Sequence, residues 1–242
     1  MRPLLSLLIS SLLLAGCASS GDPSPNGIWV NQSAIDAARN SGRLHESLLA
    51  YGPNLQWQID TAAGSAQYNN GYQQVDGHLL PGQEPGHWQV QFDREHTESL
   101  RRSGAYLLQE AGEFWPQQQF VRSKTPDAGA ASFEHALYSS LFGGDWRIVE
   151  GPGEGSLVRF SETGEVQGLP GAERFALCLA GDCAAMAGEH DMLWLQGGNQ
   201  GQNWIFAHEG NQLRLYPAIN QAAADQVPAY QPGAQHWRLK RR

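Results

Sequence analysis

The stretch Leu55-Gln56-Trp57-Gln58-Ile59-Asp60 alternates apolar and polar side chains without interruption, and Trp88-Gln89-Val90-Gln91-Phe92-Asp93 repeats the pattern. Successive side chains of a β-strand point to opposite faces, so this alternation predicts half-buried antiparallel strands. The 28 glycines and 13 prolines of the 242-residue chain supply frequent turns between such strands. The sequence therefore predicts a mainly β protein.

Aromatic landmarks divide the chain into two units with a similar plan. Gly27-Ile28-Trp29 recurs as Gly144-Asp145-Trp146, and Phe120-Val121-Arg122 recurs at the same spacing as Trp237-Arg238-Leu239. Equal spacings favour an internal repeat, with coincidence between aromatic-rich strands as the alternative. We predict two tandem antiparallel β-meander or barrel-like units, with a short helical insertion in the first.

Aromatic and arginine side chains at these landmarks are predicted to hold each unit together. Trp29 and Trp146 are expected to lie buried beside the closing strands, near Arg122 and Arg238 respectively. The predicted structural anchors are Trp29, Trp146, Trp88, Trp204, Arg122 and Arg238. Core packing is the expected role of the tryptophans, and the alternative is that they line a ligand cavity or a sugar-stacking groove.

The helical insertion is predicted over residues 33–50, where apolar side chains recur on one side of a helix. Ser33 and Asp36 resemble a capping box, and Asn40-Ser41-Gly42 is expected to split the helix in two. The resulting organisation is a leader (1–16), a flexible tether (17–26), a first β unit (27–122), a linker with a short helix (123–143) and a second β unit (144–242).

The first residues are typical of a secretory leader, with Arg2, an apolar run from Leu4 to Leu14 and small residues before Cys17. Leu14-Ala15-Gly16-Cys17 resembles the lipobox of bacterial lipoproteins. That resemblance implies cleavage before Cys17, acylation of this residue and permanent membrane anchoring. Ala18 follows the cysteine in place of the Asp of inner-membrane lipoproteins, which implies an outer-membrane location, facing the periplasm. An ordinary cleaved leader is the alternative.

A second resemblance concerns the later unit. The run from Gly164 to Phe175 is similar to the META domain of bacterial envelope proteins, but Ala172 and Glu173 stand where that family has Cys-Asn. The Gly-x-Trp openings and late arginines also resemble lipocalin-like barrels, in which a first-strand aromatic packs beneath a terminal arginine. Both resemblances imply a fold and leave the function open.

Cys178 and Cys183 are predicted to form a disulfide, because they are the two remaining cysteines in an oxidising compartment. The intervening Gly181-Asp182 predicts a turn that places them at the base of a hairpin. A redox pair and a metal site are the alternatives. Redox pairs favour two intervening residues, and a metal would need two further ligands that the local sequence lacks.

Composition and motifs exclude several kinds of function. The net charge is −8 and the chain has only two lysines, so no basic face for phosphates is expected and nucleic acid is not an expected partner. No Walker loop, Gly-x-Ser-x-Gly elbow or His-Glu-x-x-His motif is present, and the eight histidines lack metal-binding spacing. The cluster Glu189-His190-Asp191 is predicted to be a solvated loop. We expect no catalytic residue, no metal and no cofactor.

The leading hypothesis is a non-catalytic, outer-membrane-anchored lipoprotein that presents a binding surface to an envelope protein or a cell-wall glycan. One alternative is a lipocalin-like carrier of a small apolar ligand. Another alternative is a cell-envelope hydrolase, because paired carboxylates are brought together by folding and have no fixed spacing in sequence.

Overall fold

The computed structural model describes residues 24–113 and 115–242. The predicted leader, Cys17 and most of the predicted tether lie outside these residues, so lipidation stays a prediction. In the part of the chain that is described, no helix has both the length and the apolar character needed to cross a membrane.

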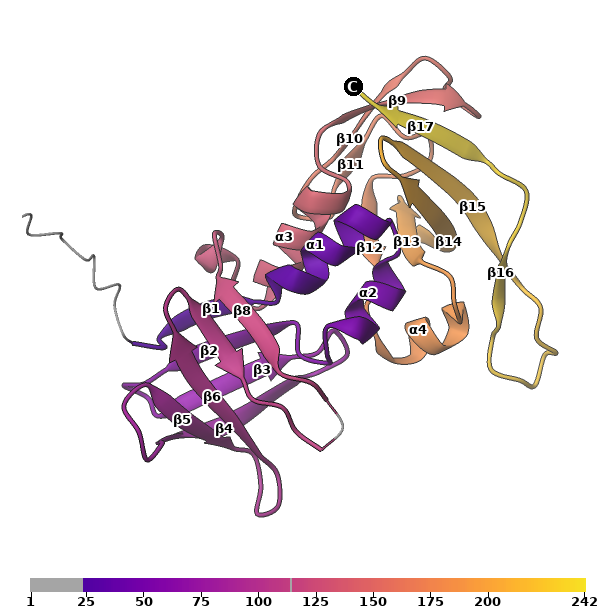
Figure 1. Cartoon of the computed structure of the whole chain (residues 1–242). Helices are drawn as coiled ribbons and strands as arrows, with labels where there is room; N and C mark the ends of the chain where they lie inside the picture. Colours follow the sequence, from indigo (N-terminus) through magenta and orange to yellow (C-terminus); the bar gives the residue numbers. More distant parts are fainter. Residues whose placement is uncertain (1–23, 114) are drawn as a thin grey trace, which may run out of the picture.

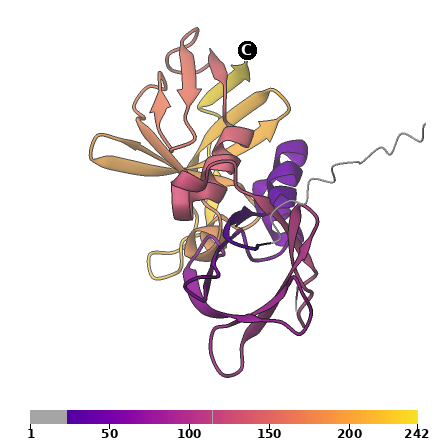
Figure 2. The ribbon, with the colours of Figure 1, turned by 90° about the vertical axis from the view of Figure 1, so that its left-hand side faces the viewer.

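The first half forms a closed antiparallel barrel in which each strand pairs with the next along the chain (Figures 1 and 2). The pairing of the first strand with the last, through Trp29 opposite Arg122, closes it. Its strands are β1 (Gly27–Val30), β2 (Gln56–Asp60), β3 (Ser65–Asn69), β4 (Gln74–Pro81), β5 (His87–Gln91), β6 (Thr97–Ser103), β7 (Tyr106–Gln109) and β8 (Gln118–Arg122).

The second half repeats this up-and-down plan in a nearly closed barrel. Its strands are β9 (Asp145–Glu150), β10 (Leu157–Phe160), β11 (Val166–Gln167), β12 (Arg174–Leu177), β13 (Met192–Gly197), β14 (Gln200–Glu209), β15 (Gln212–Asn220) and β17 (Trp237–Arg241). A single bridge between Glu165 and Arg174 spans the gap between β11 and β12. The short strand β16 (Tyr230–Pro232) pairs with the far end of β15. The predicted fold class, mainly β with two barrel-like units, is confirmed.

Short helices lie between the barrels (Figure 1). They are α1 (Gln32–Ser41), α2 (Leu44–Ala50), the 3-10 helix η1 (Pro126–Ala131), α3 (Ser132–Leu141) and α4 (Gly181–Ala187). The predicted split of the first helical region is correct, because Gly42 ends α1 with a left-handed backbone (φ 72°). The predicted cap at Ser33 is wrong. Asn31 caps α1, and its side-chain oxygen accepts a hydrogen bond from the Ala34 amide.

The helices that follow β1 belong to the core of the other barrel. Ile35 and Leu44 are at most 1% exposed, and they share one continuous apolar cluster with Phe142, Trp146 and Leu213. The interior of the first barrel is a separate cluster that contains Trp29, Trp57 and Phe120. A segment from the first half therefore completes the core of the second half, and the two barrels are joined by packing as well as by the chain.

Candidate functional site

An apolar groove of about 270 Å³ lies at the junction of the two barrels, in the described part of the chain. Its walls come from four parts of the chain: α2 with the loop after it, the β3–β4 turn, the β7–β8 loop and the loop before α4. Three large side chains beside it are exposed to solvent: Leu49 (61%), Tyr72 (65%) and Trp115 (45%). The other lining residues are Leu48, Gly52, Pro53, Leu55, Asn70, Leu179, Ala180 and Gly181.

Buried polar side chains hold the loop after α2 in place. The side-chain amide of Asn31 donates to the carbonyls of Tyr51 and Asn54, and the amide of Gln118 donates to the same two carbonyls. Position 52 favours glycine because its φ is 91° and because a methyl group there would overlap the side chain of Gln118. One wall of the groove is therefore fixed by the cap residue of α1, Asn31, and by Gln118 of β8.

The β3–β4 turn presents Tyr72 to the groove. Asn69 and Asn70 each accept backbone hydrogen bonds with their side-chain oxygens, from the amide of Gly71 and from the amides of Tyr72 and Gln73 respectively. Such turns are typical of Asn before Gly. The tyrosine ring is left exposed at a fixed position.

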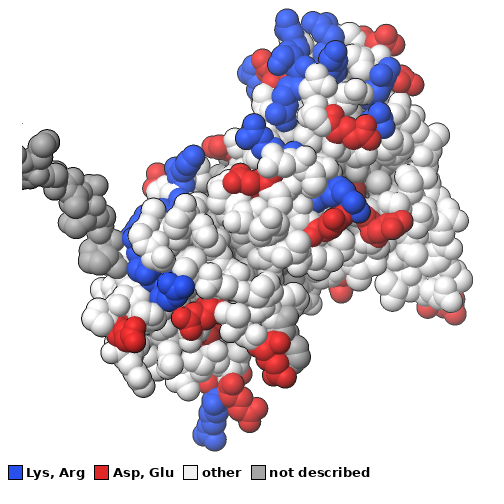
Figure 3. All heavy atoms as spheres, in the orientation of Figure 1, with Lys and Arg blue, Asp and Glu red and all other residues white. Residues whose placement is uncertain are grey.

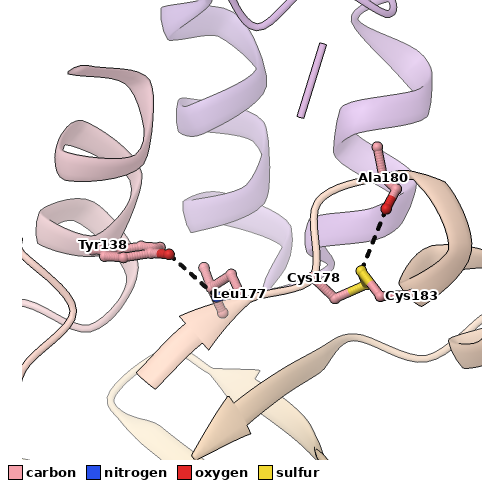
Figure 4. The surroundings of a disulfide bond; sticks show 5 residues. All are labelled: Tyr138, Leu177, Cys178, Ala180 and Cys183. Carbon is pink, nitrogen blue, oxygen red and sulfur yellow. Dashed lines mark hydrogen bonds between the residues drawn. A yellow bond between two sulfur atoms is a disulfide. The ribbon is translucent and has the colours of Figure 1, made fainter. Parts of the chain in front are cut away.

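The disulfide fixes the opposite wall (Figure 4). Cys178 and Cys183 are joined, with their Cα atoms 5.8 Å apart, so the predicted disulfide is confirmed. The predicted hairpin around it is wrong, because Cys183 lies in the first turn of α4. Ala184 to Ala187 continue as a helix, which alanine favours over a strand. The bond therefore ties the end of β12 to a helix.

Two glycines allow the barrels to touch at the groove. Gly181 faces the ring of Tyr72 so closely that any side chain there would overlap the ring. Gly71 lies against Leu55 on its own barrel and Leu179 on the other. The exposed Tyr72 is thus packed on one face by the disulfide-linked loop, and its other surface remains open.

A partly buried carboxylate joins α2 to the second barrel next to this groove. The side chain of Asp191 accepts hydrogen bonds of 2.7 Å from the backbone amides of Leu44 and His45, at the first turn of α2. Burial raises the pKa of Asp191, and the two amide hydrogen bonds oppose this rise. The prediction of a solvated loop at Glu189-His190-Asp191 is therefore wrong for Asp191, because a long-range partner brings its carboxylate inside.

The arginine of each barrel's closing strand lies over the tryptophan of its first strand. Arg122 is 4.5 Å from the ring centre of Trp29, and Arg241 is 4.6 Å from that of Trp146. Arg238, which was expected beside Trp146, instead pairs with Glu150 at the surface. The register of β17 shifts between Arg238 and Leu239, so counting along the chain selects the wrong arginine.

Trp88 and Trp204, two of the predicted anchors, are separated by nearly the same number of residues as the repeated landmarks, but they do not occupy equivalent strands. Trp88 is on β5, the fifth strand of the first barrel, whereas Trp204 is on β14, the sixth strand of the second barrel in chain order. Trp204 is 7% exposed and stacks on Trp237, with ring centres 4.8 Å apart. Trp88 packs at the edge of the first barrel cluster and is only partly buried. The matching spacing in sequence arises from unequal loop lengths.

The groove residues were not singled out by the sequence. Tyr72 and Trp115 lie in a turn and in a loop, so no strand or helix periodicity marks them. Leu49 belongs to the apolar pattern that predicted the helical region 33–50, but the structure exposes it instead of burying it. The useful signal would have been large apolar residues within polar, turn-forming stretches. The predicted anchors stabilise the barrels and do not line this groove.

The groove is lined by apolar and uncharged side chains. The described residues that line it include no carboxylate, imidazole, lysine or arginine. In residues 24–113 and 115–242, no group of three or more His, Cys, Asp or Glu residues is arranged to hold a metal ion. Comparisons with protein-family models, with curated proteins and with solved structures give no match.

Proposed function

We propose that this protein is a non-catalytic, lipid-anchored envelope protein that binds an apolar segment of a partner protein in the groove between its barrels. The observation that carries the proposal is the exposure of Leu49, Tyr72 and Trp115 around one apolar depression. Contiguous exposed apolar side chains of this kind mark interaction sites on protein surfaces. Aromatic residues are also the most frequent energetic anchors of protein interfaces.

The polar groups of the groove favour a protein segment over a glycan. A sugar needs hydrogen-bond partners for its hydroxyl groups as well as an aromatic ring for stacking. Among the lining side chains Asn70 is the only amide, and its oxygen already accepts from two backbone amides of the turn. A few apolar side chains of a peptide suit the volume and lining better.

The barrel interiors give little support to a carrier of small apolar molecules. Trp29, Trp57 and Phe120 fill the first barrel and are each 0% exposed. Phe142, Phe160, Phe175 and Phe206 contact one another inside the second. A lipocalin-like carrier needs a hollow barrel, whereas these side chains occupy the space.

The anchoring part of the proposal rests on the resemblance to a lipobox. A Cys17→Ser variant should lose labelling by a fatty-acid analogue and leave the membrane fraction. Persistent labelling of this variant would contradict acylation at Cys17.

Site-specific crosslinking in intact cells tests the binding site. A photoreactive phenylalanine analogue at position 72 should give a discrete adduct, identified by mass spectrometry. The same analogue at Tyr106, an exposed tyrosine (42%) of β7 outside the groove, is the matched control and should not give this adduct. Adding Leu49→Asp should abolish the adduct by placing a charge in the groove. Identical adducts from both positions, or no adduct, would contradict the proposal.

A further inference from the structure

A second depression, of about 460 Å³, brings cations together from distant parts of an acidic chain. Arg39 comes from α1, Arg122 and Lys124 from the end of the first barrel, and Arg241 from β17 of the second. The only carboxylate among the lining residues is Glu162. The whole chain has 16 Lys and Arg against 24 Asp and Glu, so this grouping runs against the overall charge.

Among the described residues, none of these four cations forms an ion pair with a carboxylate. The ion pairs within the described residues use other basic side chains, for example Arg159 with Asp145 and Arg214 with Glu209. Burial lowers the pKa of Arg241, and the nearby positive charge of Arg39 lowers it further. Like charges held together in a cleft create a positive potential that a bound anion would relieve.

Two of the guanidinium groups are rigidly positioned. Arg122 lies over Trp29 and donates to the carbonyl oxygens of Ser24 and Asn26. Arg241 lies over Trp146 and donates to the carbonyl oxygen of Leu141 over 2.6 Å. A site whose cations are already ordered loses less conformational entropy when a ligand binds.

The remaining lining groups add hydrogen-bond donors. The hydroxyls of Thr125, Ser139 and Ser140 and the imidazole of His135 line the same depression. Cationic and hydroxyl-bearing residues around one depression suit the several oxygens of a phosphate group better than a single carboxylate. The volume exceeds that of inorganic phosphate alone and leaves room for a substituent.

We propose that the cleft formed by Arg39, Arg122, Lys124 and Arg241 binds a phosphate-bearing anion. Two sources have this chemistry: a free phosphate compound and the headgroup of an anionic phospholipid. Arg122 contacts Ser24, which is seven residues after Cys17, so an extended chain would keep the cleft within about 25 Å of that residue. The headgroup source rests on the proposed membrane anchoring, whereas binding of the anion does not.

The test uses the full chain, purified in a non-ionic detergent and washed until no phospholipid phosphorus remains. Inorganic phosphate and glycerophosphoglycerol, a lipid headgroup without acyl chains, are titrated separately by ³¹P NMR. We expect saturable binding of at least one probe, weakened at least ten-fold in Arg39→Gln/Lys124→Gln. This pair leaves the two arginines that pack on tryptophan intact, and an unchanged melting temperature verifies folding.

Arg94→Gln/Lys240→Gln is the matched control, because it removes one arginine and one lysine outside the cleft. Its affinity should equal that of the unmodified protein. Binding of both probes identifies the phosphate group itself as the ligand, and binding of glycerophosphoglycerol alone identifies the headgroup. The proposal is overturned if neither probe saturates below about 10 mM, or if both double variants bind alike. Neither outcome affects crosslinking at position 72.

Discussion

Trp29 and Trp146 make the same contact in the two barrels: each donates its indole N–H, over 2.7 Å, to the carbonyl of the residue four positions earlier, Pro25 and Phe142 respectively. Each ring is fully buried and is covered by the arginine of the closing strand. This arrangement joins the segment before the barrel, its first strand and its last strand. It explains why Gly-x-Trp opens both units.

Replacement of Trp146 by alanine should destabilise the second barrel by about 3 to 5 kcal/mol, the usual effect of removing a buried aromatic side chain. Because α1 and α2 share the core of that barrel, hydrogen exchange should quicken in residues 32–50 as well as in residues 145–241. Residues 56–122, whose core is separate, should exchange as before. Trp194→Ala, at a 38% exposed tryptophan of β13, is the control and should change little. Continued protection of residues 32–50 would show that the helices do not depend on this core.

The two late arginines should differ sharply in their effect on stability. Arg241→Gln removes the contact with Trp146 and the hydrogen bond to the carbonyl of Leu141. The free energy of unfolding, measured in urea, should therefore fall by about 2 kcal/mol. Arg238→Gln removes only a surface ion pair with Glu150 and should cost less than about 1 kcal/mol. An equal loss of unfolding free energy in both variants would contradict the assignment of Arg241, instead of Arg238, as the arginine that stabilises the barrel through Trp146.

Asp191 should be needed to hold α2 in place. Asp191→Ala leaves the amides of Leu44 and His45 without their acceptor, which should cost about 1.5 to 3 kcal/mol. Exchange of these two amides, followed by NMR, should accelerate. Glu189→Ala, at an exposed neighbour, provides the comparison and should leave both amides protected. If the two variants behaved alike, the carboxylate would not be holding α2.

His208 should make the fold sensitive to mild acid. Burial, followed by the nearby Arg241, lowers the pKa of this side chain from its ordinary value of 6.5. At pH values between the lowered pKa and 6.5, the unfolded chain therefore binds more protons than the folded protein. The free energy of unfolding should fall as the pH decreases through this range. The melting temperature of His208→Gln should depend less on pH than that of the unmodified protein. His78→Gln, at an exposed position of β4, should retain the full dependence.

Local patterns predicted the fold because they reflect local geometry. The alternation over residues 55–60 and 88–93 matches the two faces of β2 and β5. Asn69-Asn70-Gly71 matches the turn before Tyr72. Arg241 was missed because a bulge in β17 changes the count, and α4 was missed because Gly181-Asp182 also suits a helix start. In both cases the outcome depends on neighbouring strands that a short window does not contain.

The candidate sites could not be predicted for a different reason. The amphipathic face of α1 is visible in the sequence, but nothing in it identifies the second barrel as its partner. The groove and the cationic cleft are each assembled from segments of both halves. In Figure 3 Lys and Arg gather near the C-terminus, where the sequence shows a basic run, whereas Arg39 and Lys124 join their cluster only through folding.

Helices α1 and α2 come from the first half of the chain but complete the core of the second barrel, and this has a consequence for the order in which the parts fold. Ribosomes make α1 and α2 before any strand of the barrel that they cover. Until β9 to β17 arrive, the apolar side of these helices has no final partner, and the first barrel can close without them because its interior is a separate cluster. Newly made protein can therefore pass through a stage with a finished barrel and an uncovered apolar helix pair, which is a form that chaperones would recognise.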